Sequence, residues 1–246
     1  MRRGVLLAGL VLMTGCATGL PMGGYAVASS FRYRPLTPPA APKEPLSVAA
    51  SPARQKQVRP PPPEVDREEV VATARGLVGN RKVRVAGRTW PSDCTGFVEA
   101  VYAKAGVSFR GAGVPRDNGV TAIYRYIQAH GRVYTSGRPR PGDLVFFRET
   151  YDQNRDGRRN DGLTHVGLVD EVEEDGTVVV IHRVRRGVVR YRMNLEKPHL
   201  RRDPRTGEVL NDMLRVPGVG QAPVLTGQLF ASYGTVLPEP ESVARR

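Results

Sequence analysis

The chain has 246 residues, of which 40% are hydrophobic, and 37 Lys and Arg against 24 Asp and Glu give a formal net charge of +13. This length allows one domain of ordinary size with appendages, and the hydrophobic content suffices for a buried core. The charge attracts polyanions, but the sequence has no helix-turn-helix, zinc-finger or aromatic RNA-binding motif, so we expect no nucleic-acid partner.

The first 16 residues predict export and lipid attachment. Arg2 and Arg3 precede an apolar run over residues 5–13, which is shorter than the roughly 20 residues of a membrane-spanning helix. Residues 12–16 read Leu-Met-Thr-Gly-Cys and resemble the lipobox at which bacterial prolipoproteins are cleaved and acylated. This resemblance implies a lipid on Cys16 and an anchor in the envelope membrane. Because Ala17 is not the aspartate that retains some lipoproteins in the inner membrane, the outer membrane is favoured. An ordinary signal peptide with an incidental cysteine is the alternative.

Residues 17–64 predict a disordered tether. The segment is rich in proline and small residues, ends in four prolines at 60–63, and has no amphipathic period that could build a core. In polyproline conformation, at roughly 3.1 Å per residue, it would span on the order of 100 Å. Such a tether would let a domain search the cell-wall mesh from its membrane anchor.

Residues 65–237 predict one folded domain with a C-terminal extension, followed by a tail over residues 238–246. Apolar residues at helical spacing predict helices over 65–78, from Ser92 or Asp93 to Gly106, and over 120–129. Strands are predicted over 144–147, 166–172 and 178–184, and a last helix over 225–233. Helices first and a mainly antiparallel sheet afterwards indicate the α+β class.

Cys94 is the candidate nucleophile. If Cys16 is acylated, Cys94 has no partner for a disulfide, since the chain has only two cysteines. Its predicted place is the first turn of a helix, where free backbone N–H groups and the helix dipole lower a thiol pKa below its free value of roughly 8.5. The N–H groups at Asp93 and Cys94 are candidates for an oxyanion hole.

A cysteine nucleophile needs a base and a group that orients the base. Of the four histidines, His165 begins one predicted strand and His182 lies in the next. A four-residue loop over 173–176 would place both on the same sheet face, whereas a three-residue loop would place them on opposite faces. We expect His130 and His199 to be ordinary surface or core residues.

Four blocks in order resemble the NlpC family of papain-like cell-wall cysteine peptidases. They are Asp-Cys-Thr-Gly-Phe-Val at 93–98, Pro-Gly-Asp-Leu-Val-Phe-Phe at 141–147, Thr-His-Val-Gly-Leu-Val at 164–169, and Ile-His at 181–182. The resemblance implies Cys94 as nucleophile, His165 as general base and His182 as the residue that orients its imidazole.

The resemblance also implies the reaction, which is acyl transfer to the thiol and hydrolysis of an amide bond in peptidoglycan stem peptides, with no cofactor required. An amidase or acyltransferase on the same scaffold is one alternative, because the Cys/His machinery accepts other amides and esters. A non-catalytic lipoprotein that binds the wall is the other.

The segment between the second and third blocks predicts a structural calcium ion. Asp152, Asn154, Asp156 and Gly157 match positions one, three, five and six of an EF-hand-like loop, but position twelve is Leu163 in place of the closing Glu. Asn160 or Asp161 could close a shorter site. A solvated turn with Asx hydrogen bonds would explain the same residues.

Overall fold

The computed structural model describes residues 65–215 and 223–238. The predicted signal peptide, Cys16 and the tether over residues 17–64 lie outside the described residues, as does the tail beyond residue 238. Within the described part, no helix has the length and hydropathy needed to cross a bilayer.

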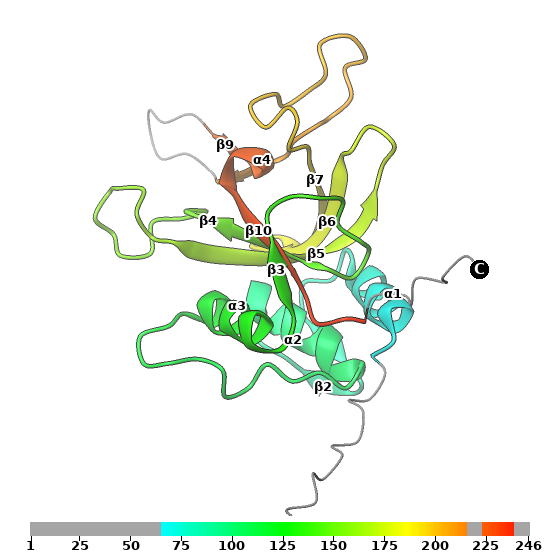
Figure 1. Ribbon diagram of the computed structural model, residues 1–246, viewed down its shortest axis with the longest axis vertical. Coiled ribbons are helices and arrows are strands. Elements are labelled where there is room, and N and C mark those ends of the chain that lie inside the picture. The colour runs from blue at the N-terminus through cyan, green and yellow to red at the C-terminus, as the bar shows by residue number, and fades with distance from the viewer. Residues whose placement is uncertain (1–64, 216–222, 239–246) are drawn as a thin grey trace, which may run out of the picture. The chain divides into compact units, whose positions relative to one another are not determined.

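The described chain forms four helices and ten strands in the order α1 Arg67–Leu77, β1 Arg84–Val85, β2 Arg88–Thr89, α2 Cys94–Lys104, α3 Gly119–His130, β3 Arg132–Tyr134, β4 Leu144–Arg148, β5 Leu163–Val172, β6 Val178–Val184, β7 Gly187–Met193, β8 Met213–Arg215, β9 Val224–Leu225, α4 Thr226–Leu229 and β10 Phe230–Thr235. Six strands make one antiparallel sheet in the order β3-β10-β4-β5-β6-β7. Figure 1 shows α1, α2 and α3 on one side of this sheet, with α4 and β9 on the other. The fold is α+β, as predicted.

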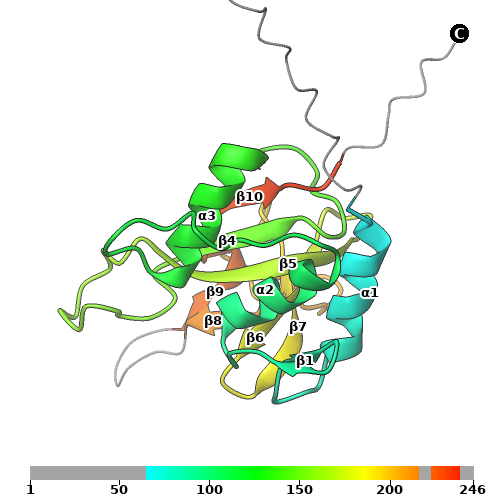
Figure 2. The ribbon, with the colours of Figure 1, turned by 90° about the horizontal axis from the view of Figure 1, so that it is seen from below.

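The first three helices lie within a few residues of their predicted bounds because their caps and apolar faces are local signals. Asp66, Asp93 and Asn118 cap α1, α2 and α3 by accepting hydrogen bonds from backbone N–H groups in the first turn. Figure 2 shows these helices from their own side of the sheet, with α2 packed against β5. The helices therefore bring the N-terminus of α2, and Cys94 with it, to the sheet.

Two apolar clusters occupy the two faces of the sheet. The helix side holds the larger cluster, which includes Phe97, Tyr102, Phe146, Leu168 and Ile181. The other side holds a smaller cluster, whose buried members are Val145, Phe147, Val169, Val178, Val180, Met193, Leu229 and Tyr233. Both faces of the central strands are thus buried, which fixes their register.

The β5–β6 connection differs from its prediction. Val172 pairs with Val178, so five residues, not four, separate the paired strands. One extra residue would move His182 to the opposite face, but a bulge at Asp170 shifts the register back, and Val169 pairs with Val180. The Asp170 carboxylate is buried and accepts hydrogen bonds from Arg75 at 2.5 Å and Arg190 at 2.6 Å.

The predicted helix over 225–233 is wrong for most of its length. Only Thr226–Leu229 is helical, and Phe230–Thr235 forms strand β10 between β3 and β4. Tertiary pairing overrides the local pattern here, because β10 closes an otherwise open edge of β4 and buries Tyr233. The extension before α4 is held by buried Asn211, whose Oδ1 accepts hydrogen bonds from the N–H groups of Asn194 and Gly227.

Candidate functional site

Cys94 begins α2 as its first residue. Asp93 caps the helix, with Oδ1 accepting a hydrogen bond from the Gly96 N–H at 2.8 Å and another from the Thr95 hydroxyl at 2.8 Å. A side chain at Gly96 would place its Cβ 2.2 Å from the Pro91 carbonyl oxygen, so only glycine fits beside the chain that enters the helix. The local sequence therefore fixes the turn that presents the thiol.

The prediction of a lowered Cys94 pKa is wrong. Burial raises the pKa of the Cys94 thiol to about 11, the neighbouring Asp93 carboxylate adds to the rise, and hydrogen bonds from backbone N–H groups, chiefly that of Val166, only partly oppose it. Desolvation outweighs the helix N-terminus because the ionised form would lose its hydration. The thiol is therefore neutral at neutral pH.

His165 and His182 meet as predicted. His165 Nε2 lies 2.8 Å from His182 Nδ1, and both side chains are buried. Continuing the pairing of Leu168 with Ile181 puts His182 opposite Gly167, two residues from His165 on the same face. A Cβ at Gly167 would lie 2.6 Å from Val180 Cγ1 and 3.1 Å from His182 Cβ, so the glycine makes room for the second histidine.

Both imidazoles are neutral at neutral pH. Burial lowers the pKa of His165 to about 4. Burial also holds the pKa of His182 well below its usual value, with further lowering from His165 and from the Arg186 guanidinium. His182 Nε2 is buried without a hydrogen-bond partner among the described residues, and the ring packs edge-on against Tyr191 with centroids 4.5 Å apart.

Cys94 and His165 line one cavity of about 530 Å³. It lies between the N-termini of α2 and α3, the start of β5 and the β6–β7 turn, and its wall includes Tyr151, Arg183 and Arg185. No hydrogen bond joins Cys94 to His165 within the described part of the chain. Catalytic hydrogen bonds are commonly long before substrate binds, so the lack of a hydrogen bond between Cys94 and His165 is compatible with their roles as nucleophile and base.

Sequence reasoning missed Asn118, which ties the start of β5 to α3. Its Oδ1 accepts a hydrogen bond from Thr121 N–H, while Nδ2 donates to the Leu163 carbonyl at 2.8 Å and to Gln153 Oε1 at 3.0 Å. The cap signal before α3 could have identified it, because asparagine is a preferred N-cap residue. Its second role depends on long-range contacts that the sequence does not display.

The second sequence block has a structural role. Buried Asp143 accepts hydrogen bonds from Arg67 at 2.8 Å, from the Tyr134 hydroxyl at 2.6 Å and from Arg140 N–H at 2.9 Å. These contacts join α1 and β3 to the start of β4. The block therefore supports the sheet and does not contribute a side chain to the Cys94 cavity.

The predicted calcium residues form a turn closed by their own hydrogen bonds. Asp152 Oδ2 accepts from the Gly157 N–H, Asp161 Oδ1 accepts from the Asn154 N–H, and the Asn154 side chain donates to Asp156. The other carboxylate oxygens, Asp152 Oδ1 and Asp161 Oδ2, are buried without a partner. Over residues 65–215 and 223–238, no group of three or more Asp, Glu, His or Cys could hold a metal ion. Calcium at this loop stays a prediction.

Comparison with known families bears on the segment that holds these residues. The family model of the CHAP domain matches residues 84–183, a segment that contains Cys94, His165 and His182. No curated protein matches the chain. The NlpC assignment stays a prediction. Residues 84–183 match the CHAP model, and CHAP domains are typically cysteine-dependent hydrolases that act on peptidoglycan.

Proposed function

We propose that this protein is a cysteine peptidase with a papain-like fold of the NlpC type that hydrolyses amide bonds in peptidoglycan stem peptides. One observation carries the proposal: the cavity that presents Cys94 at the N-terminus of α2 also presents His165, whose ring is held by buried His182. The CHAP match over the same residues supports peptidoglycan as the substrate.

The proposed reaction starts from a neutral thiol and a neutral imidazole. His165 carries its proton on Nε2 and donates a hydrogen bond through it to His182 Nδ1, so the unprotonated Nδ1 of His165 acts as the base. As the Cys94 sulfur attacks the amide carbon, His165 Nδ1 takes the thiol proton. The backbone N–H of Cys94 stabilises the oxyanion, with the N-terminal end of α2 adding its partial positive charge.

The tetrahedral intermediate then collapses. The C–N bond breaks, and the proton on His165 Nδ1 passes to the leaving amine, which leaves an acyl group on the Cys94 sulfur. Water attacks this thioester while His165 again accepts a proton, and that proton returns to the sulfur as the carboxylic acid departs. His182 keeps the ring oriented through both steps, because its bond to Nε2 is not broken.

We also propose that the mature protein is anchored by lipid on Cys16, with the outer membrane favoured, and that residues 17–64 tether the domain. The lipobox-like sequence at residues 12–16 supports the anchor. Mass spectrometry of the mature N-terminus tests it. Acylation of Cys16 that is lost in a Cys16→Ser variant supports the anchor, whereas cleavage at another residue without acylation contradicts it.

The function is tested by digestion of purified peptidoglycan with the full-length protein and with its Cys94→Ala variant, with the products read by mass spectrometry. Cys16→Ser is the matched control, because it removes the other cysteine and keeps the proposed nucleophile. New stem-peptide fragments that require Cys94 support the peptidase. Cleavage of the bond between peptide and glycan instead identifies an amidase, and wall binding without any cleavage identifies a non-catalytic lipoprotein.

A further inference from the structure

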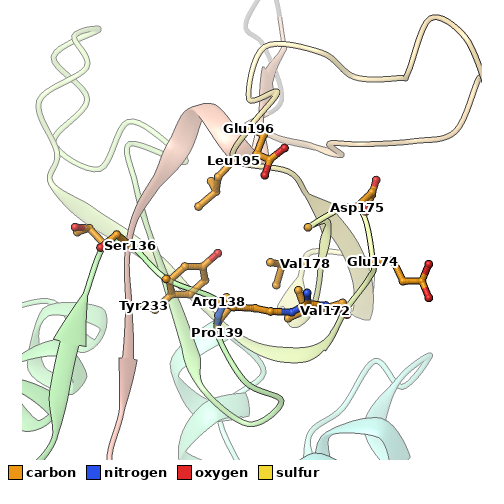
Figure 3. A pocket seen from close by; sticks show the side chains of 13 residues that line it. Ser136, Arg138, Pro139, Val172, Glu174, Asp175, Val178, Leu195, Glu196 and Tyr233 are labelled. Atoms are coloured by element: carbon orange, nitrogen blue, oxygen red, sulfur yellow. Dashed lines mark hydrogen bonds between the residues drawn. The ribbon is translucent and has the colours of Figure 1, made fainter.

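A second cavity, of about 600 Å³, lies away from the Cys94 cavity. Four segments build it: the β3–β4 connection, the β5–β6 hairpin, the chain after β7, and β10 (Figure 3). Val172 lines it at the end of β5, seven residues beyond His165, which corresponds to about 20 Å along a strand. This spacing separates the cavity from the proposed chemistry.

The Tyr233 hydroxyl is an unpartnered polar group inside this cavity. The Tyr233 side chain is 1% exposed, and its ring is fixed between Phe230 and Tyr134, with centroid distances of 4.7 and 5.3 Å. Figure 3 shows the hydroxyl pointing into the cavity. Two other tyrosine hydroxyls donate to protein groups at 2.6 Å, Tyr102 to the Gly142 carbonyl and Tyr134 to Asp143. In the described chain the Tyr233 hydroxyl donates to no such group, and it opens onto the cavity, where a ligand can reach it.

The rim of the cavity is acidic, although the chain as a whole carries a net charge of +13. Three carboxylates line it, from Glu174, Asp175 and Glu196, against the one guanidinium of Arg138. Arg138 donates to the carbonyls of Val172 and Glu173, on the β5 side. Glu174 points outward in Figure 3, while Glu196 stands beside Leu195 on the opposite rim. The cavity therefore favours a cation on its Glu196 side.

The lining fits an organic ammonium better than a metal ion. Both Asp175 oxygens already accept hydrogen bonds from Thr177, and the described residues contain no cluster that could hold a metal. Leu195 and Val178 present apolar surface next to the Tyr233 hydroxyl. An ammonium group on an aliphatic stem would match both the apolar surface and the hydroxyl. Such side chains lay their methylene groups on apolar surface and leave the charge at a polar end.

We propose that this cavity is a binding site for an aliphatic primary ammonium group, of the kind carried by the side chain of lysine or of a diamino acid in a peptide. The Tyr233 hydroxyl oxygen accepts a hydrogen bond from the ammonium, Glu196 supplies the opposing charge, and the stem lies on Leu195 and Val178. The site holds a peptide independently of the Cys94 cavity and does not depend on the proposed hydrolysis.

Isothermal titration of the full-length protein with Nα-acetyl-lysine methylamide tests the proposal, with the norleucine analogue as the uncharged comparison. Wild-type protein is expected to bind the lysine derivative more tightly than the norleucine derivative, and added salt is expected to weaken binding. Tyr233→Phe should raise Kd by about three- to tenfold through the loss of one hydrogen bond. Glu196→Gln should raise it by about two- to fivefold through the loss of an exposed ion pair.

Glu208→Gln is the matched control, because Glu208 is an exposed carboxylate that does not line the cavity. This variant should bind like wild type. Glu196 is also exposed, so its substitution tests the site without disturbing the core even if Tyr233→Phe changes stability. Absence of binding at tens of millimolar probe, equal binding of the norleucine analogue, or an equal effect of Glu208→Gln and Glu196→Gln would each overturn the proposal.

Discussion

The two ends of β5 carry cavities of similar size and opposite character. At the start of the strand, Cys94 is half-buried and His165 and His182 are buried, and desolvation moves each pKa towards the neutral form. At the far end, the carboxylates of Glu174 and Glu196 are exposed, and the Tyr233 side chain is buried with its hydroxyl pointing into the cavity. The first arrangement suits proton transfer between neutral groups, and the second suits capture of a charged ligand.

The contrast shows that burial decides what each end can do. The helix dipole predicts an ionised Cys94 thiol, and the basic composition predicts a surface that attracts anions. Instead, the Cys94 thiol is neutral, and the Tyr233 cavity is lined by three carboxylates and one guanidinium.

Apart from replacement of the nucleophile itself, the largest effect is expected from His182. His182→Leu removes the hydrogen-bond partner of His165 Nε2 and lets the ring turn, so kcat on stem peptides should fall by roughly 10²–10³, the scale of general acid–base catalysis. His199→Leu is the control, since His199 bonds to Gln228 on the surface. Steady-state kinetics of both variants measures the effect. Equal activity of the two would show that His182 does not orient the base.

The pH dependence of Cys94 alkylation tests the buried thiol. Because the pKa of Cys94 is raised to about 11, the thiolate fraction, and with it the rate of iodoacetamide reaction, should rise about tenfold per pH unit from pH 8 to 10. The measurement uses a Cys16→Ser background, so that only one thiol is present. A rate that is already constant above pH 8 would contradict the raised pKa and would support the ionised Cys94 predicted from the sequence.

Acid inactivation tests the buried imidazole in the same cavity. The pKa of His165 is lowered to about 4, below its usual value, so the base is neutral above that pH and protonated below it. We expect kcat/KM to stay level as the pH falls from 7 to 5 and to drop tenfold per unit below about 4. Initial rates on a soluble stem peptide measure this. An acid limb near pH 6.5 would indicate a solvated histidine.

A smaller effect is expected from Gly167, which makes room for His182. In Gly167→Ala the new Cβ meets Val180 at 2.6 Å, and such overpacking typically costs about 1–3 kcal/mol of unfolding free energy. Gly76→Ala is the control: it lies in α1 with nothing within 4 Å, so alanine should stabilise that helix slightly. Urea denaturation of both variants compares them, and equal unfolding free energies would contradict the packing at Gly167.

The smallest effect is expected from calcium at the loop over 152–161. If the ion binds Asp152 and Asp161 through their unpartnered oxygens, 1 mM Ca²⁺ should raise Tm by about 2–4 °C, and a chelator should reverse the rise. Asp152→Asn should abolish the shift, and Glu208→Gln should keep it. An unchanged Tm in wild type would leave the loop as a turn held by its own hydrogen bonds.

Local signals explain most of what the sequence predicted. Asp66 and Asp93 cap helices whose apolar stripes are continuous, and the strands around His165 and His182 have strong β patterns. The histidine pair itself depended on the hairpin register. The connection is one residue longer than expected, and the bulge at Asp170 compensates for it. That bulge is held by Arg75 and Arg190, which lie far away in sequence, so no local pattern reveals it.

The remaining features depend on tertiary burial. The pKa of Cys94 follows from how much protein covers the thiol, which its place at a helix start does not determine. Strand β10 forms because β3 and β4 offer it partners, although residues 225–233 resemble a helix. The Tyr233 cavity joins four segments between residues 135 and 233, and no spacing in the chain brings them together.

The most direct test of the central claim is digestion of purified peptidoglycan by the full-length protein beside its Cys94→Ala variant. The account predicts stem-peptide fragments with wild type and with Cys16→Ser, and a loss of at least about 10³-fold in rate with Cys94→Ala, because the proposed acyl intermediate forms on the Cys94 sulfur. Equal cleavage by wild type and Cys94→Ala would contradict the assignment of Cys94 as the nucleophile.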